Sequence, residues 1–435
     1  MTRMGRPSLW RQRDFAKIWS AATVSAMGSQ VTIIALPFLA LTMLNASVFQ
    51  VSLLAAVEML PFLLFTLPAG AWLDRMRRRP ILVAADIARA VTLSSIPVAF
   101  VAGALTLWQL YVVAFVTGTL TAFFDIADQL YLPAILDRDD LVDGNAHLQI
   151  SYSVAQIGGP IVGGNIIALV AAPWAIAVDA LSFLASGALI STIRRREEKP
   201  ARRLDDSGRP ASIRSEVTEG LRYVLGHKYL RPIAASTGIS NLFGAALFSI
   251  FPVLIWHELR LPAAFFGSVM GAASVGFLVG AALASRLPAS IGIGRTIVAS
   301  AALACPAYVL LSLTSGDLNL AAVTLFVGWF VVGMSQVIYN VAQISLRQAI
   351  TPPELQSRMN ATMRFIVWGT IPIGSLLGGA LATFVPVRGA LMFAALASFI
   401  AVLPLLASPL SLLRDIPGEG DLGPGSMPFV ASPAT

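Results

Sequence analysis

The chain has 435 residues, of which 56% are hydrophobic and 12% are charged, and its formal net charge is +7. Soluble domains carry about 25% charged residues, so this composition excludes a soluble enzyme or binding module and indicates a polytopic membrane protein. The positive charge could indicate nucleic-acid binding, but the basic residues stand in short loops between apolar runs, as membrane topology predicts.

A helix needs about 20 consecutive apolar residues to cross the hydrocarbon core of a bilayer. Twelve such runs occur, six before and six after a polar central stretch. The predicted fold is therefore all-α, with twelve transmembrane helices in two six-helix halves. The predicted spans are 18–44, 50–73, 81–102, 107–134, 148–170, 173–193, 232–256, 264–286, 295–314, 319–346, 360–384 and 388–408.

Changes in composition divide the chain into four parts. An N-terminal half, 1–193, and a C-terminal half, 231–410, flank a polar stretch at 194–230 that is predicted to be a cytoplasmic linker. Apolar residues recur at helical spacing in the second part of this linker, which predicts an amphipathic helix on the inner membrane surface. The tail 411–435 is rich in Gly, Pro, Ser and Ala and is expected to be disordered in the cytoplasm.

The basic residues also predict the orientation, because loops rich in Lys and Arg stay in the cytoplasm. With the N-terminus inside, nearly all loop cations fall on one side, and only Arg260 and Arg388 fall on the other. We therefore expect a multi-pass protein of the cytoplasmic membrane with both termini in the cytoplasm.

The loop between the second and third spans is short and strongly basic. From Gly70 to Pro80 it reads Gly-Ala-Trp-Leu-Asp-Arg-Met-Arg-Arg-Arg-Pro. A charge at bilayer depth costs at least ~2.5 kcal/mol, so this run is predicted to be a tight turn at the membrane surface. It could serve topology alone, or it could pair with an acid, for which Asp125 and Asp128 near the cytoplasmic end of the fourth span are candidates.

The fifth span contains Gly-Gly-Pro-Ile-Val-Gly-Gly at 158–164, where glycines allow close helix approach and proline allows a bend. An internal repeat accompanies it. A shift of 215 residues places Gly159 on Gly374 and Gly163 on Gly378, in the eleventh span. The same register in both halves predicts a parallel repeat with a paired structural role for the two glycine-rich helices.

The basic loop, the glycine-proline helix, the six-plus-six count and the repeat resemble the major facilitator superfamily, most of all its drug and siderophore exporters, which include enterobactin and macrolide exporters. The resemblance covers nearly the whole chain and implies alternating access between two parallel six-helix repeats. It implies export of a small amphipathic molecule in exchange for protons and a charge lock at the cytoplasmic side. It also implies an antiporter-like motif in the fifth helix. Ala155 departs from this motif, because the family usually has glycine at that position. The carried-over residues are Gly70, Asp74, Arg75, Arg78, Arg79, Asp125 and Asp128 for the lock, and Gly159, Pro160, Gly163 and Gly164 for the motif.

Two acids within the spans are candidate proton carriers. Glu58 stands mid-span in the second helix among apolar residues, where a lone carboxylate is expensive when ionised. A structural hydrogen bond to a neighbouring helix is the alternative. Asp179 lies in a part of the sixth span that resembles siderophore and macrolide exporters, and a structural role is the alternative there too. Asp86 and Arg89 lie one to two turns into the third span.

By the same resemblance, the first, fourth, seventh and tenth helices surround the substrate cavity. Apolar walls with a few polar groups suit a moderately large amphipathic solute, although such residues more often serve packing. The polar candidates are Gln30, Asn241, Gln336, Asn340 and Gln343.

No enzyme or cofactor is expected. The chain has no Gly-x-x-x-x-Gly-Lys-Ser/Thr nucleotide motif, and its three histidines and one cysteine do not predict a metal site. The expected partners are a small-molecule substrate, protons and the lipid bilayer, without nucleic acid, and the expected state is a monomer. The alternatives are a proton-independent facilitator or importer on the same fold, and a non-transporting membrane-embedded enzyme or assembly factor.

Overall fold

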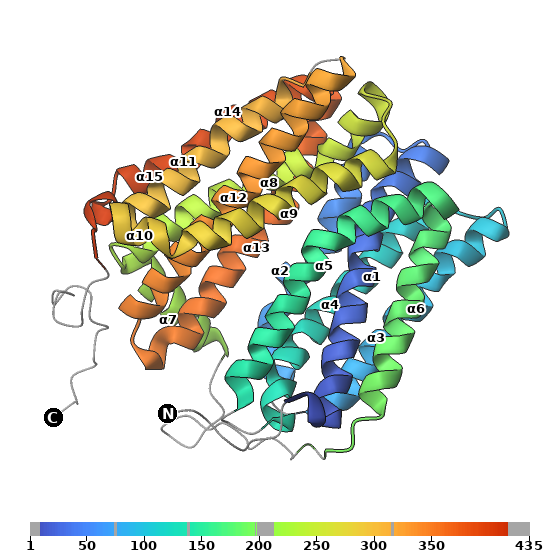
Figure 1. The fold of residues 1–435 in the computed structure, drawn as a ribbon, viewed down its shortest axis with the longest axis horizontal. Coiled ribbons are helices and arrows are strands. Elements are labelled where there is room, and N and C mark those ends of the chain that lie inside the picture. The colour runs from blue at the N-terminus through green and yellow to red at the C-terminus, as the bar shows by residue number, and fades with distance from the viewer. Residues whose placement is uncertain are drawn as a thin grey trace. The chain divides into compact units, whose positions relative to one another are not determined.

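The computed structural model describes residues 9–73, 76–136, 140–195, 197, 213–314 and 317–415, and these ranges contain helices and no strand. Within these described ranges, twelve helices are long and apolar enough to cross a membrane, which confirms the predicted all-α polytopic fold (Figure 1). They are α1 (Arg13–Met43), α2 (Val48–Leu73), α3 (Arg78–Val101), α4 (Leu107–Ile135), α5 (Leu141–Val170), α6 (Ala172–Ser191), α8 (Leu230–Val253), α9 (Ala263–Ala284), α11 (Ile293–Ser312), α12 (Leu318–Ile350), α13 (Pro353–Phe384) and α14 (Val387–Ala397), the last continued by η4 (Ser398–Val402) and α15 (Leu403–Leu406).

Two helices begin about two turns earlier than hydropathy predicts. α5 begins at Leu141 and α13 at Pro353, whereas their predicted spans begin at 148 and 360. A helix of 30 residues is about 45 Å long, while the hydrocarbon core is about 30 Å thick. Because their first turns can extend beyond the hydrocarbon, polar side chains there do not end these helices.

The last predicted span is not one continuous helix. α14 ends at Ala397, a 3₁₀ segment follows over Ser398–Val402, and α-helix resumes at Leu403. Pro404 has no N–H to donate to the carbonyl four residues earlier, and Ser398 donates its hydroxyl to the carbonyl of Ala395 at 2.6 Å. Both features disturb the regular α-helical ladder, which explains the tighter turn here.

Contacts divide the chain into two compact units. The first contains Met1–Pro210 and Pro252–Gly271, and the second contains Ala211–Phe251 and Ala272–Thr435. The end of α8 and the start of α9 therefore belong to the first unit. The short helices α7 (Ile213–Gly226) and α10 (Arg286–Ile291) belong to the second.

α7 lies in the linker and packs against α13 within the second unit. Arg358 Nη1 and Glu219 Oε1 are 2.6 Å apart, and Val224 is fully buried. Gly220 lies against the backbone of Arg358 and the side chain of Thr362, where a β-carbon would clash. The amphipathic helix thus uses its apolar side for contact with α13.

In the first unit, α1 packs against α5 and α6, α3 packs against α4 and α6, and α2 packs against α4 (Figure 1). A cluster of buried residues that includes Phe15, Leu82 and Tyr131 joins α1, α3 and α4. These contacts bring polar residues of four helices into one interior, which is described below.

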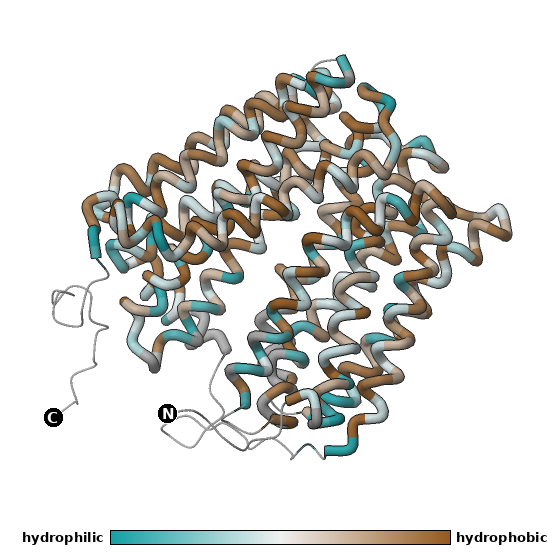
Figure 2. Tube along the Cα trace, viewed as in Figure 1, coloured by the Kyte–Doolittle hydropathy of each residue, from teal (hydrophilic) through white to brown (hydrophobic). Residues whose placement is uncertain are grey.

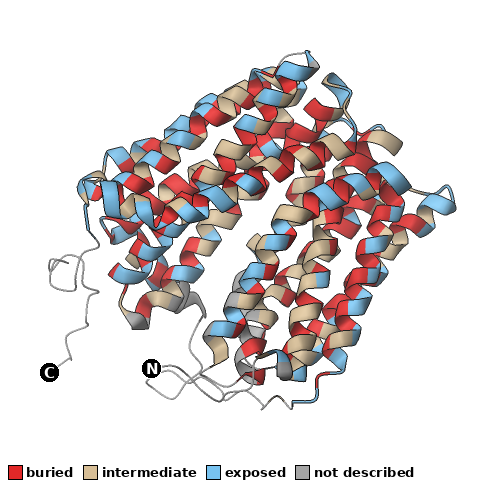
Figure 3. Ribbon diagram, viewed as in Figure 1, coloured by how far each residue is buried: buried red, intermediate tan, exposed pale blue. Residues whose placement is uncertain are grey.

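Many apolar side chains remain exposed on the helices. Val101, Trp108 and Leu169 are 71%, 77% and 83% exposed. Figure 2 shows that the helices are largely hydrophobic, and Figure 3 shows exposed turns along the same helices. Each large apolar side chain left in water forgoes about 1.5–3 kcal/mol, whereas lipid solvates it. These surfaces are therefore suited to a bilayer.

Candidate functional site

A buried ion pair on α3 is the centre of the site. Arg89 Nη2 lies 2.5 Å from Asp86 Oδ1, and the two side chains are 3% and 0% exposed. The residues are three positions apart, so they lie on the same face of α3. Charges at membrane depth must be paired, and this pair meets that requirement about two to three turns inside the helix, which begins at Arg78.

Two aromatic rings hold the guanidinium of Arg89. Its Cζ lies 4.2 Å from the ring centroid of Phe124 on α4 and 4.2 Å from that of Phe183 on α6. Cations are attracted to aromatic faces at such distances, most strongly where water is excluded. Arg89 is therefore a fixed positive charge rather than a mobile side chain.

Asp179 on α6 is buried next to this pair, 1% exposed. Its carboxylate accepts hydrogen bonds from the hydroxyl of Thr32 on α1 and from that of Ser182, the latter at 3.0 Å. Asp179 also interacts electrostatically with Arg89. The predicted proton carrier in the sixth helix is thus part of the same cluster, with two hydroxyl donors of its own.

The two acids of α4 complete what we call the Arg89 cluster, formed by Asp86, Arg89, Asp125, Asp128 and Asp179. Asp125 interacts electrostatically with Arg89. Asp128 interacts electrostatically with Asp125 and with Arg89. The hydroxyl of Tyr152 on α5 donates to Asp128 Oδ2 at 3.1 Å. Four carboxyl groups thus share one arginine, so the cluster is negative unless it also binds protons.

Two glycines let the helices approach closely enough to form this cluster. A β-carbon on Gly28 of α1 would clash with Asp179 and Ser182, and one on Gly187 of α6 would lie 3.2 Å from Cβ of Asp86. A larger side chain at either position would push α6 away from α1 or α3. These small residues therefore serve the charge cluster as well as helix packing.

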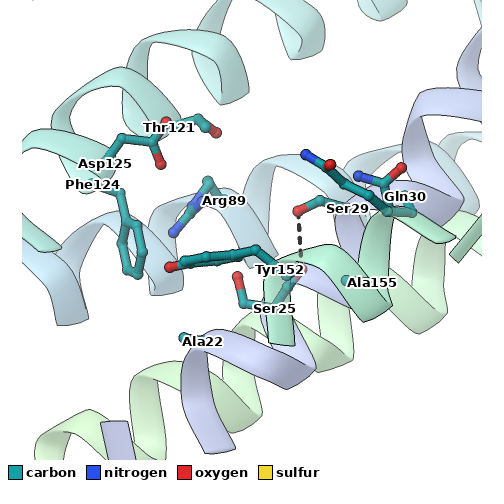
Figure 4. Close-up of a pocket in the computed structure, with 12 residues that line it drawn as sticks. Ala22, Ser25, Ser29, Gln30, Arg89, Thr121, Phe124, Asp125, Tyr152 and Ala155 are labelled. Atoms are coloured by element: carbon teal, nitrogen blue, oxygen red, sulfur yellow. Dashed lines mark hydrogen bonds between the residues drawn. The ribbon is translucent and has the colours of Figure 1, made fainter. Parts of the chain in front are cut away.

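A cavity of about 210 Å³ opens beside the cluster within the first unit. Arg89 and Asp125 form part of its wall together with Phe124 and Tyr152, and α1 contributes Gln30 (Figure 4). Gln30 is therefore a cavity-lining residue here, as the sequence predicts for the first helix. Ser25, Ser29 and Gln156 also contribute to the wall.

The fifth-helix motif sets the distance between α5 and α1. A β-carbon on Gly159 would clash with Cβ of Gln30 and lie 2.5 Å from its Cγ, and one on Gly163 would lie 3.0 Å from Cα of Val31. Ala155, the departure from the family motif, is buried and lines the cavity. The motif thus fixes the position of a cavity-lining side chain.

The repeated glycines make the corresponding contacts in the second unit. A β-carbon on Gly374 of α13 would clash with the backbone of Leu242 on α8, and one on Gly378 would clash with that of Ala246. The pair α13 and α8 is thus built like the pair α5 and α1.

The last glycine of the motif contacts α9. A β-carbon on Gly164 would lie 2.7 Å from the carbonyl oxygen of Ala263, and one on Gly267 would clash with the carbonyl of Pro160. One on Gly271 would lie 2.6 Å from Ile161. All of these residues belong to the first unit. Small residues on both helices therefore allow backbone-to-backbone packing along the motif.

The basic loop is bound to the start of the linker. Arg78 Nη1 donates to Glu197 Oε1 at 3.1 Å, and the backbone N–H groups of Arg78 and Arg79 donate to the same carboxylate at 2.7–3.1 Å. Glu197 is only 4% exposed. A carboxylate at a helix N-terminus satisfies free N–H groups and interacts favourably with the helix dipole, so Glu197 caps α3.

The other predicted lock residues have separate surroundings. Arg79 donates from Nε to the carbonyl of Ile190 at 3.3 Å and from Nη2 to that of Ser191, at the end of α6. Gly70 lies in the last turn of α2. Asp74 and Arg75 lie outside the described residues. Asp125 and Asp128 lie in the Arg89 cluster, so the observed acidic partner of Arg78 is Glu197.

Glu58 lies on α2, apart from these groups. Its side chain is half-buried, and within the described ranges its carboxylate has no hydrogen bond or ion pair. Its backbone carbonyl packs against Gly118 of α4, where a β-carbon would clash.

The polar candidates of the second unit differ in burial. Asn241 donates to the carbonyl of Val367 at 2.9 Å, and Gln343 is 3% exposed and accepts a hydrogen bond from Arg347 at 3.0 Å. Gln336 is exposed and Asn340 is partly buried. The amides of Asn241 and Gln343 are thus used in contacts inside the unit. Among the described residues, no three His, Cys, Asp or Glu side chains are arranged to hold a metal ion.

The sequence does not reveal the central position of Arg89 or the capping role of Glu197. The sequence does place Asp86 and Arg89 three positions apart inside an apolar span. Charges at that depth must pair inside the protein, so this spacing could have indicated the importance of Arg89. Glu197 is 119 residues from Arg78 and gives no local signal.

Comparison with known proteins places the chain in a family. The model of the family described as "Transmembrane secretion effector" matches residues 7–417. The multidrug efflux pump Tap of Mycolicibacterium fortuitum is 28% identical over 380 residues, which cover 83% of this chain and 87% of Tap. Tap of Mycobacterium bovis is 29% identical over 416 residues, or 93% and 94% of the two chains. A crystal structure of the nucleoside transporter NupG has the same fold, with a TM-score of 0.71 and 13% identity over 92% of this chain and 99% of NupG. The chain belongs to the transmembrane secretion effector family of the major facilitator superfamily, and it is a multi-pass membrane transporter rather than an enzyme.

Proposed function

We propose that this protein exports a small amphipathic molecule, such as a drug, a siderophore or another natural product, across the cytoplasmic membrane. The observation that carries this proposal is the similarity, over most of both chains, to pumps named for multidrug efflux. The cavity beside Arg89 supports it, because its wall combines apolar surface, such as the ring of Phe124, with many polar side chains, as an amphipathic molecule requires.

We further propose that protons supply the energy by antiport. The Arg89 cluster supports this, because a buried group of acids with a single arginine is costly unless some of the acids bind protons. A conformation that admits water to the cluster would lower that cost and release protons. Protonation would then favour one conformation over the other, which is the requirement for coupling in alternating access.

The cytoplasmic lock is proposed to include Glu197. The loop residues Asp74, Arg75, Arg78 and Arg79 remain in the proposed lock, with the three arginines as its basic groups. The capping of α3 by Glu197 supports an additional acidic group in the linker. Breaking the contact between Glu197 and the first N–H groups of α3 would release the N-terminus of this helix. The same helix carries Asp86 and Arg89 further along. We also propose that the chain acts as a monomer with both termini in the cytoplasm, as the distribution of loop cations predicts.

The proposed function can be tested by efflux in a bacterium that lacks its own drug exporters. Cells that express the wild-type chain should retain less of a fluorescent substrate than cells with an empty vector, and a protonophore should abolish the difference. Asp179→Asn and Glu58→Gln compare the two proton-carrier candidates, and Gly158→Ala serves as a control because a β-carbon there meets no atom within 4 Å. Export that survives the protonophore would contradict antiport, and accumulation above the empty-vector level would indicate an importer.

A further inference from the structure

Arg347, in the last turn of α12, is a buried positive charge with neutral partners. It is 8% exposed. Its Nη1 donates to Oε1 of Gln343 at 3.0 Å, and its Nη2 donates to Oδ1 of Asn360 on α13 at 3.1 Å. Tyr339 also interacts electrostatically with it, whereas none of the carboxylates that the structure describes pairs with the guanidinium. A buried charge without an opposite charge is costly, and an anion bound here would remove that cost.

The C-terminal end of α12 does not supply the missing negative charge. A cation at such an end can bind the free carbonyls of the last turn. Gln343 precedes Arg347 by one turn, so the guanidinium lies back along α12, away from those carbonyls. The carbonyls of Arg347 and Ile350 accept instead from the hydroxyls of Thr351 at 2.7 Å and Tyr223 at 3.4 Å. The charge of Arg347 is therefore not used to cap its own helix.

One edge of the guanidinium is incompletely bonded. Nε has no hydrogen-bond acceptor among the described residues. Nε and Nη2 lie on the same edge of a guanidinium, and such an edge can donate to both oxygens of one carboxylate. Asn360 bonds to Nη2 on this edge from an exposed position. Rotation of the Asn360 side chain would therefore open the edge to an anion without movement of a helix.

A second arginine adds positive charge on this side. Arg364 follows Asn360 by four positions, so the two residues lie on the same face of α13. Its Cζ lies 5.6 Å from the ring centroid of Trp368, and it has no acidic partner within the described ranges. An anion that replaces the Asn360 amide at Arg347 would thus have another cation one turn further along α13.

We propose that these residues form a site for the carboxylate group of an organic anion, with both oxygens at the Nε–Nη2 edge of Arg347. A planar carboxylate matches this edge, whereas a single chloride ion does not, so the carboxylate is the preferred ligand. Arg347, Asn360 and Arg364 all belong to the second unit, whereas the Arg89 cluster belongs to the first. The inference goes beyond the proposed export function and does not depend on it.

The test uses the purified full-length protein in detergent and two probes of nearly the same shape. Benzoate carries a carboxylate, and benzamide carries a neutral amide in its place. Equilibrium binding should be at least about tenfold tighter for benzoate, because hydrogen bonds to charged groups contribute at least that much. Chloride should compete only at concentrations far above that of benzoate. Benzoate that binds no tighter than benzamide, or that chloride displaces at equal concentration, would overturn the proposal.

Two variants assign the binding to Arg347. Arg347→Gln should lose the preference for benzoate over benzamide. Asn360→Asp supplies the missing negative charge from the protein itself, so it should pair with Arg347, abolish benzoate binding and raise the melting temperature. If Arg347→Gln does not fold, Asn360→Asp and the two probes on the wild type still decide. Benzoate binding that is unchanged in Asn360→Asp would contradict the site.

Gln348→Glu is the matched control for the added charge. Gln348 is exposed and stands one residue further along α12, with its side chain on a different face from that of Arg347. This variant should keep the preference for benzoate, and its loss here would show that net charge rather than the Arg347 edge controls binding. Because binding is measured without transport, a protein that exports nothing would contradict the proposed function and leave this result unchanged.

Discussion

Gln30 on α1 packs directly on Gly159 of α5, with no room for a β-carbon between them. This contact joins the glycine-proline motif to the cavity, because the side chain of Gln30 lines it. The position of the cavity wall therefore depends on the absence of a side chain at Gly159.

Gly159→Ala should destabilise the protein, because the new methyl group must displace Gln30 or separate α5 from α1. Overpacking of this kind costs about 1–3 kcal/mol. Gly158→Ala is the matched control, because a β-carbon there meets nothing within 4 Å. Thermal unfolding of the two variants in the same detergent measures the difference, and equal melting temperatures would contradict the packing described for Gly159.

Glu197→Gln should destabilise the protein more than Glu219→Gln. Glu197 is 4% exposed and binds the N-terminus of α3, whereas the pair of Glu219 with Arg358 is 50% and 35% exposed. Loss of a carboxylate at a helix N-terminus costs about 0.3–1 kcal/mol or more when buried, and exposed pairs contribute about 0–1 kcal/mol. A double-mutant cycle with Arg78→Gln should show coupling for Glu197, and additive effects would contradict the contact.

Arg89→Gln should be among the most damaging single changes in the first unit. Removal of one partner from a buried ion pair costs about 3–5 kcal/mol, because the remaining charge is uncompensated. Arg89→Lys should restore little, since an ammonium cannot fill the planar space between Phe124 and Phe183. The double variant Asp86→Asn/Arg89→Gln should be more stable than Arg89→Gln alone, as measured by yield and melting temperature. A double variant that is worse than both single ones would contradict the pairing.

Stability should depend on pH through His227, which lies between α7 and α8. Its Nδ1 accepts hydrogen bonds from the backbone N–H groups of Tyr229 and Leu230, with N···N distances of 3.2 and 3.3 Å. Burial, with a smaller effect of Lys228, lowers the pKa of His227 from its ordinary value of 6.5 to about 4. The folded protein thus keeps His227 neutral below pH 6.5 while the unfolded chain binds a proton, so the free energy of unfolding falls between pH 6.5 and 4.

His227→Asn provides the control for this pH dependence. Asparagine keeps an oxygen acceptor for the start of α8 and does not titrate in this range. The melting temperature of the wild type should fall more steeply between pH 7.5 and 5 than that of His227→Asn. Parallel curves would show that His227 does not contribute.

The sequence predicts the helices well because each apolar run must cross the same thickness of hydrocarbon. It does not predict where a helix extends past the membrane, so α5 and α13 begin about two turns earlier than expected. The interruption of the last span by 3₁₀ structure depends on one proline and one serine, to which a hydropathy average is insensitive.

The site is less visible in the sequence than the fold. Asp125, Asp128 and Asp179 are noticeable as acids in apolar spans, but their assignment to one cluster needs the packing of α3, α4 and α6. The rings that hold Arg89 are separated by 59 positions along the chain, at Phe124 and Phe183. Only the folded structure shows that Arg89, which the sequence places inside the third span, is the centre of the buried charges.

The most direct test of the account is proton movement driven by substrate. Membrane vesicles turned inside out would be acidified by respiration and followed with a fluorescent pH probe, and a drug that the protein exports in the efflux assay would then be added. The account predicts that this drug dissipates the gradient in vesicles with the wild-type chain and leaves it unchanged in vesicles with an empty vector. Uptake of the drug by wild-type vesicles without any change in the gradient would contradict proton antiport.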